Sequence, residues 1–311
     1  MKKDKNKENG MQAPSVQQEK PKKKRRRRWG DRSDGRRVRG IYPMQFMIPF
    51  LMKERSDAQN HFEDEIDITN VESYLRKKHS EGHSELGFLH LFIAAYVRAI
   101  AERPAINRFV SGQHVFARPD VVAVMPIKKE MSIHSPDTLI KIHLDQRDTA
   151  LQVYEKFEAV RQDAISREND FDKLAARLMK LPRFMLRFIV FVLRGLDYFG
   201  LLPKSLIEVS PFHGSVIFTS MGSLGINAIY HHLYNFGNLP VFFSYGKMYT
   251  KTTFGASGEA ERRHYVTVRA VVDERICDGY YYASAFKIMK RYLLHPELLD
   301  TEMTEFQEDI D

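Results

Sequence analysis

Hydrophobic and polar residues alternate with a period of two in several short segments, which is the pattern of β-strands with one buried face. Other segments carry apolar residues three and four positions apart, which predicts helices. The predicted strands are residues 62–69, 113–116, 121–128, 139–144, 215–220, 239–247 and 265–272. The predicted helices are residues 69–78, 86–103, 149–169 and 280–294, with a short apolar helix or turn at 41–52.

Residues 171–203 have a helical pattern of a different kind. On a helical wheel the basic side chains fall within an arc of about 120° and apolar side chains occupy the rest. The longest unbroken apolar run, residues 188–193, is far short of the ~20 residues needed to cross a bilayer. Three interpretations remain: a helix buried between subunits, a helix in a membrane interface, or a core hairpin. The basic side chains are Arg177, Lys180, Arg183, Arg187 and Arg194.

Composition adds that the folded body is not basic, although the whole chain is. The 311 residues are 43% hydrophobic, enough for one large domain or two small ones. Residues 1–40 carry 16 Lys and Arg against 5 Asp and Glu, whereas the remaining residues carry 32 against 35. The single cysteine, Cys277, excludes an internal disulfide framework and fits a reducing compartment. No apolar segment follows Met1, so we expect no cleaved secretory signal and a cytoplasmic protein.

Both ends of the chain have the composition of tails. Residues 1–36 have almost nothing to bury, and we expect a disordered basic tail there. Its basic run, residues 22–29 ending in Trp29, is either a solvated segment or a non-specific site for an anionic partner, lipid or nucleic acid. Binding to lipid would place the protein peripherally on a membrane. Residues 297–311 form an acidic tail that is either solvated or in contact with a neighbour's basic N-terminus.

The most specific motif lies between the predicted strand at 265–272 and the predicted helix at 280–294. It reads Asp273-Glu274-Arg275-Ile276-Cys277-Asp278-Gly279. This junction resembles the coenzyme A-dependent acyltransferase family that joins chloramphenicol acetyltransferase to the catalytic core of the dihydrolipoamide acyltransferases. That family carries His-x-x-x-Asp-Gly here, commonly within Asp-His-Arg-x-x-Asp-Gly. Glu274 stands at the position of the histidine.

Other segments extend the resemblance to residues 37–296, with 171–205 as a divergent helical insertion. They are the Asp-x-Thr strand end at Asp67, the Pro-x-x-Asn sequence at Pro104, the Ser and Gly turn at 220–225, and the strand that ends in Gly246-Lys247. Nothing in the chain is similar to a lipoyl domain. The resemblance implies an α/β fold, a mixed sheet flanked by helices, in a trimer whose active sites lie between subunits.

The resemblance also implies roles for individual residues. The family histidine takes a proton from the thiol or hydroxyl acceptor of an acyl group carried by coenzyme A, and a serine donates to the oxyanion. Ser220 is the matching serine, and a shift of the alignment would select Ser223. Asp278 would pair with Arg37 or Arg39 and hold the loop that also contains Arg275 and Gly279. No metal is implied.

The substitution at position 274 leaves two functions open. A carboxylate with an ordinary pKa of about 4.3 is a poor base for a thiol with a pKa of about 8.5, although burial can raise a carboxyl pKa. Nearby Arg269 and Arg275 would favour the weakly basic, ionised form. The chain is therefore either an acyltransferase with an atypical base or an inactive trimeric scaffold or regulatory homologue. The alternative bases are His213, His231 and His232, although histidines at such positions are more often surface or core residues.

Overall fold

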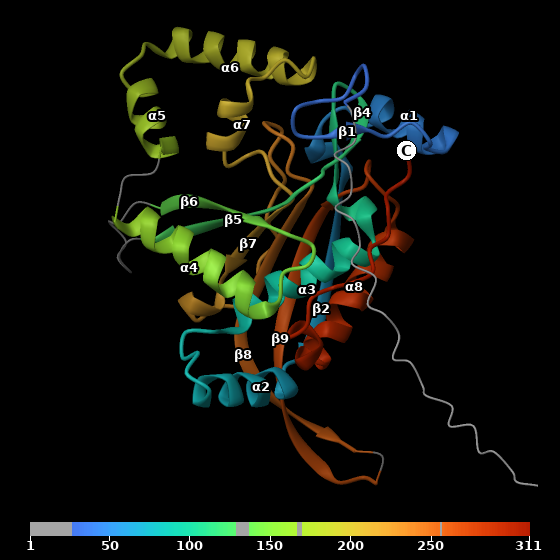
Figure 1. Ribbon diagram of the computed structural model, residues 1–311, viewed down its shortest axis with the longest axis vertical. Coiled ribbons are helices and arrows are strands. Elements are labelled where there is room, and N and C mark those ends of the chain that lie inside the picture. Colours follow the sequence, from blue (N-terminus) through green and yellow to red (C-terminus); the bar gives the residue numbers. More distant parts are fainter. Residues whose placement is uncertain (1–26, 129–136, 167–169, 256) are drawn as a thin grey trace, which may run out of the picture.

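The structure, a computed structural model, describes residues 27–128, 137–166, 170–255 and 257–311. Six strands within these ranges form one sheet in the order β2, β9, β8, β7, β5, β6 (Figure 1). Strand β7 is parallel to both β5 and β8, and the other pairs are antiparallel, so the sheet is mixed as predicted. The strands are β2 (Gln59–Asp67), β5 (Val121–Lys128), β6 (Asp137–Leu144), β7 (Val216–Ser220), β8 (Val241–Phe254) and β9 (Ala260–Asp273).

One face of the sheet is covered by helices α3 (Phe88–Glu102), α4 (Ala150–Ser166) and α8 (Gly279–Leu294) (Figure 1). Helix α2 (Thr69–Ser80) packs beside α8. Alternate strand residues such as Phe218 and Phe243 point toward α3, whose residues 88–101 are almost all buried. This is the two-layer arrangement that the alternating and helical patterns predict, and the main core lies between the layers.

The opposite face of the sheet is covered by irregular backbone. Ile217, Phe242 and Val271 point to this side and form a second, smaller cluster with Leu233 and Leu239 of the segment 226–240. A small antiparallel sheet of β1 (Arg36–Arg37), β4 (His114–Ala117) and β3 (Arg108–Ser111) adjoins the body. Helix α1 (Pro43–Leu51) lies next to this small sheet (Figure 1).

Ordered structure begins earlier than the composition of the N-terminal tail predicts. The Arg32 side chain is buried and pairs with Asp34 (Nε–Oδ1 2.8 Å) and Asp197 (Nη2–Oδ1 2.6 Å). A charged residue can be buried and ordered in this way because the carboxylates replace the water that would otherwise solvate its charge. Composition alone does not reveal this effect. The basic residues 22–26 lie outside the described ranges.

The acidic C-terminal segment also lies on the body of its own chain. The Gln307 N–H donates to the Ala101 carbonyl at 2.8 Å, and Asp309 pairs with the buried Arg108. Asp311 pairs with Arg36 of the N-terminal segment at 3.1 Å. The predicted attraction between acidic and basic ends is therefore present, but it acts within one chain and the segment is not simply solvated.

The 171–203 segment folds as separate helices at one end of the molecule, above the sheet edge formed by β6 (Figure 1). They are α5 (Asp170–Leu178) and α6 (Arg183–Tyr198), followed by α7 (Lys204–Val209). Only Asp197 of α6 is buried. The core-hairpin interpretation is therefore wrong, because the phenylalanine side of α6 faces outward. No helix among the described residues combines the length and apolar character needed to cross a bilayer.

Candidate functional site

The corner after β9 is held by a buried ion pair. Arg275 donates to Asp273 through both Nε and Nη2, each at 2.8 Å, and both side chains are almost completely buried. Arg275 also donates to the carbonyls of Met52 (3.3 Å) and Lys53 (2.9 Å). The aspartate and arginine of the motif therefore fix the position of the residue between them, Glu274.

The loop that follows is fixed from three further elements. The Tyr282 hydroxyl of α8 donates to the Asp273 carbonyl at 3.1 Å. The Ile276 carbonyl accepts from Gln45 of α1 at 2.9 Å and from Arg108 of β3 at 3.3 Å. Gln45 and Arg108 were not predicted as site residues, since they contact backbone and no motif marks them.

Asp278 caps helix α8. Its Oδ1 accepts from the Tyr281 N–H at 2.8 Å, which satisfies one of the free donors of the first helical turn. The predicted pair with Arg37 or Arg39 is not found among the described residues. Arg39 instead pairs with Asp31 at 3.2 Å, and the Arg37 N–H donates to the same carboxylate. Within one chain, Asp278 thus holds the loop through the helix terminus and not through an arginine.

The Glu274 carboxylate is partly exposed, and it makes no hydrogen bond or ion pair with another described residue. The residue is held through its backbone, whose N–H donates to the Ala58 carbonyl at 2.9 Å. The two arginines close to it in sequence are engaged elsewhere: Arg275 with Asp273, and Arg269 with Glu63 at 2.6 Å. The carboxylate is therefore available to an external group.

Ser220 ends strand β7, and Gly222 in the turn that follows lies close against the backbone of β8. A Cβ on Gly222 would lie 2.7 Å from the Gly246 carbonyl oxygen, so only glycine fits there. The Ser223 N–H lies 3.4 Å from the Ser220 Oγ, to which it donates. Burial raises the pKa of the Tyr245 phenol, and a hydrogen bond with Ser220 opposes that shift. Ser223 is exposed and donates its hydroxyl to the Ser220 carbonyl at 3.0 Å.

One chain does not bring Glu274 and Ser220 together. In the register of the sheet, Ser220 is paired with Tyr245 of β8, and Tyr245 is paired with Val268 of β9. Glu274 lies six residues beyond Val268. Because a strand rises about 3.3 Å per residue, the two functional groups are separated by roughly 20 Å along the strands. A site that uses both groups needs a second copy of the chain.

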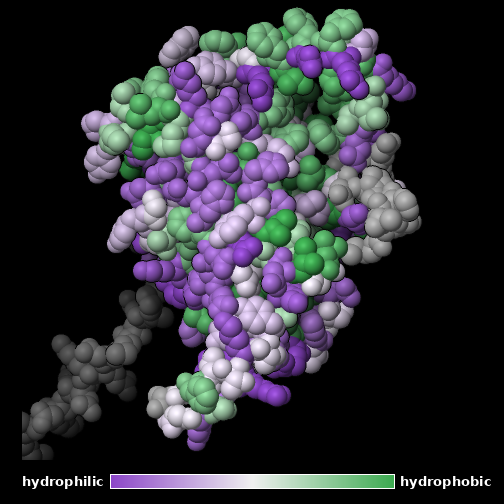
Figure 2. All heavy atoms as spheres, turned by 180° about the vertical axis from the view of Figure 1, so that it is seen from behind, coloured by the Kyte–Doolittle hydropathy of each residue, from purple (hydrophilic) through white to green (hydrophobic). Residues whose placement is uncertain are grey.

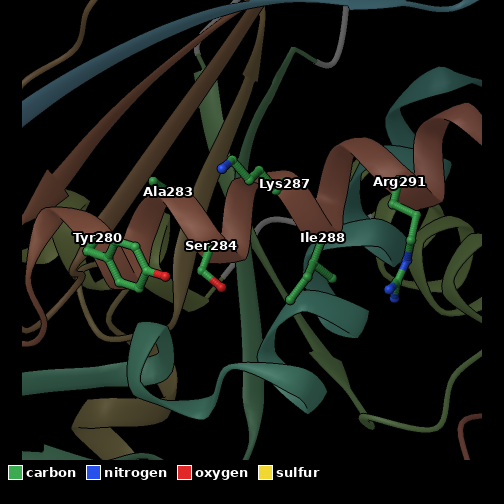
Figure 3. A pocket seen from close by; sticks show the side chains of 6 residues that line it. All are labelled: Tyr280, Ala283, Ser284, Lys287, Ile288 and Arg291. Carbon is green, nitrogen blue, oxygen red and sulfur yellow. The ribbon is translucent and has the colours of Figure 1, made fainter.

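A hollow of about 370 Å³ runs along helix α8, directly after the corner. Tyr280, Ser284, Ile288 and Arg291 extend from one side of the helix, and Lys287 projects from another (Figure 3). Arg103 donates to the Ser284 hydroxyl at 2.8 Å, and Arg291 pairs with Glu102 at 2.5 Å. The Lys287 ammonium has no ion pair with another described residue. The remaining lining residue is Ala283.

None of the three alternative histidines makes a hydrogen bond or ion pair with Glu274 among the described residues. His213 is buried, 2.8 Å from the Ser210 hydroxyl and 3.5 Å from Asp197, and burial lowers its pKa. His231 stacks on Phe242 with ring centroids 4.1 Å apart, and His232 is exposed. Within the described part of the chain, no three His, Cys, Asp or Glu side chains are grouped as a metal site would need.

No protein-family model matches the sequence, and no curated protein does. Solved structures are nevertheless similar to the chain. A probable dihydrolipoamide acetyltransferase from Listeria monocytogenes has a TM-score of 0.52 at 16% identity, over 88% of this chain and 99% of that one. The dihydrolipoamide acetyltransferase of Azotobacter vinelandii has a TM-score of 0.55 at 14% identity, over 84% and 93%. The cubic core of a pyruvate dehydrogenase multienzyme complex has a TM-score of 0.50 at 13% identity, over 82% and 88%. The chain therefore has the fold of the dihydrolipoamide acetyltransferase core, as the corner motif and its flanking elements predicted.

Proposed function

We propose that the chain is a coenzyme A-dependent acyltransferase whose active site forms between two copies, with Glu274 from one copy and Ser220 from the next. The observation that supports this most directly is the Glu274 carboxylate, which is partly exposed and unpaired at a rigid corner. In an inactive scaffold, nothing would require this carboxylate to stay clear of the nearby arginines.

The proposed reaction moves an acyl group from the sulfur of coenzyme A to a thiol or hydroxyl acceptor. Glu274 removes the acceptor proton while the acceptor attacks the thioester carbonyl, and Ser220 donates to the oxyanion that develops there. The carbon–sulfur bond then breaks, and Glu274 returns the proton to the departing sulfur. A neighbouring copy packed over the corner would exclude water from Glu274 and strengthen it as a base.

The similar structures support these assignments without deciding them. The Azotobacter structure was solved to investigate the roles of a serine, a histidine and an asparagine in catalysis. That histidine and asparagine are four residues apart, as are Glu274 and Asp278. Lys287, beside the hollow along α8, is the cation that would meet the phosphates of coenzyme A.

Assembly is supported by the β8 and β9 hairpin, which projects beyond the body (Figure 1). Strand β7 pairs with β8 only as far as Tyr245, so from Met248 to Phe254 the edge of β8 that faces away from β9 has no strand beside it within the described chain. An uncovered strand edge is a surface for pairing with another chain. We propose a homotrimer, as in the family that the sequence resembles.

The test is release of free thiol from acyl-coenzyme A in the presence of small thiol and hydroxyl acceptors. We expect slow turnover that Glu274→Ala abolishes and that Glu274→His raises by about 10²-fold or more, since histidine is the better base near neutral pH. Glu155→Ala, at an exposed glutamate of α4, is the matched control and should have no effect.

The second candidate is the inactive scaffold, and the same variants separate the two. If the wild-type and Glu274→His chains bind no coenzyme A by calorimetry and release no thiol with any acceptor, the acyltransferase proposal is wrong. Trimers in sedimentation velocity, together with this lack of binding, would then support the scaffold.

A further inference from the structure

Helix α6 presents a row of phenylalanines to the outside. Phe184, Phe188 and Phe191 are four and three residues apart, so they share one side of the helix. Their exposed fractions are 72%, 64% and 73%, whereas a large aromatic side chain is ordinarily buried. Met185 and Val192 extend the same apolar side. We call these five side chains the α6 apolar face.

Cations without partners border this face. Arg183, Arg187 and Arg194 lie on one flank of α6, and their side chains make no hydrogen bond or ion pair with another described residue. The same is true of Arg177 and Lys180, which precede the helix. Some surface arginines elsewhere are paired, such as Arg161 with Glu158 and Arg291 with Glu102.

The acidic residues of this segment do not neutralise these cations. Asp172 accepts a hydrogen bond from Thr138. Asp197 is buried and pairs with Arg32 on the other side of α6. Burial would raise the pKa of Asp197, but His213 and Arg32 outweigh it and lower that pKa to about 2. Asp197 therefore anchors the C-terminal end of α6 to the body and leaves the cations exposed.

A second apolar surface lies at the same end of the molecule. Tyr42, which precedes α1, and Met44 and Leu51 of α1 are mostly exposed. The Tyr198 hydroxyl at the end of α6 donates to Gln113 at 3.0 Å, and Gln113 lines a hollow together with Phe46 of α1. Figure 2 shows apolar side chains gathered over this end of the body. The turn between β3 and β4, which contains Gln113, thus lies between α6 and α1, and both helices expose apolar side chains there.

We propose that this end of the protein docks on an anionic lipid surface through α6. An interfacial helix places its apolar side at the boundary between headgroups and acyl chains, with basic side chains beside it that reach the phosphates. The α6 apolar face and its unpaired arginines have this arrangement. A twofold contact between copies through α6 would place the same cations against one another, which disfavours a second copy as the occupant.

Cosedimentation of the full chain with vesicles tests the proposal. We expect binding to phosphatidylcholine vesicles containing about 30% phosphatidylserine and little binding to phosphatidylcholine alone, with affinity falling as salt rises. Each cation near an anionic surface contributes about fivefold, so Arg183→Gln with Arg187→Gln should weaken binding roughly 25-fold. Phe188→Ser with Phe191→Ser should weaken it about tenfold or more.

Matched controls separate α6 from other surfaces. Leu298→Ser removes an exposed leucine beyond the end of α8, and Arg76→Gln with Lys77→Gln removes two exposed cations of α2. Both controls should bind as the wild type does. The measurements are repeated in a full chain whose basic residues 22–28 are glutamine, so that the N-terminal run cannot account for the binding.

A fluorescent probe reports whether α6 itself enters the lipid. Trp29 is the only tryptophan, so Phe188→Trp in a Trp29→Phe chain places a single probe on α6. We expect a blue shift and quenching by brominated lipids in anionic vesicles, and neither effect for Leu298→Trp in the same background.

Three outcomes would overturn the proposal. They are vesicle binding that the α6 variants leave unchanged, an emission spectrum of the Phe188→Trp chain that anionic vesicles do not alter, and a blue shift that depends on protein concentration without vesicles. The last outcome would show that a second copy covers α6.

Discussion

Replacing Asp273 by asparagine tests how much the buried pair at the corner contributes to stability. The substitution keeps the shape of the side chain but removes the negative charge that pairs with Arg275, whose side chain is 3% exposed. Arg55 is also affected, because it is buried nearby and Asp273 opposes the fall of its pKa to about 10 that burial causes. Removing one partner of a buried pair costs about 3–5 kcal/mol, since a charge is left in a medium that cannot solvate it.

Urea unfolding followed by circular dichroism measures this cost. We expect the midpoint for Asp273→Asn to fall by about 1 M or more with an unchanged slope, since slopes are about 3 kcal/mol/M or somewhat larger for a chain of this size. Arg161→Gln, which breaks the more exposed pair with Glu158, is the control and should cost no more than about 1 kcal/mol. A loss for Asp273→Asn as small as that of the control would contradict this cost, because it would show that water reaches the pair.

Three further predictions concern separate parts of the chain. Ser220→Ala should lower kcat by about 10²-fold or more if Ser220 is the oxyanion donor, and Ser223→Ala should not; the reverse ranking would select Ser223. His90 has a pKa lowered by burial to about 4, so the unfolded chain binds the extra proton and stability falls from about pH 6.5 to about pH 4, by about 3 kcal/mol. His90→Asn keeps an acceptor for the Gly87 N–H and should reduce the fall of the urea midpoint over this pH range. A fall as steep as that of the wild type would contradict the assignment of the pH dependence to His90. Gly237→Ala should destabilise the protein by about 2 kcal/mol or more, because φ is +78° and the new Cβ would lie 2.1 Å from the Phe212 carbonyl oxygen. Gly225→Ala, with a similar φ and open space around it, is the control and should cost about 1 kcal/mol in the same urea unfolding measurement.

The fold could be predicted where local pattern and tertiary environment agree. Strand β5 has the predicted bounds, and helices α3 and α8 differ from the predicted ranges by one or two residues. Strand β3 was missed because it is short, begins with Arg108 and is defined by its pairing with β4. Strand β8 continues to Phe254, well beyond its apolar half, because β9 pairs with it along the projecting hairpin.

The candidate site was predictable in its motif but not in its partners. The strand, turn and helix around Glu274 follow from local sequence, because each residue there has a strong local preference. The pairing of Arg275 with Asp273, and the contacts of Gln45 and Arg108 with the loop, depend on elements far apart in sequence. For the same reason, the arginine partner expected for Asp278 was not found among the described residues.

The separation of roughly 20 Å between Ser220 and Glu274 along the sheet affects how the proposed activity would respond to dilution. When protomers part, each retains its secondary structure but holds only half of the reacting groups. Turnover per chain would then drop at low concentration without any loss of helix or strand signal. Abundance in the cell would in this way set the specific activity, with no effector required.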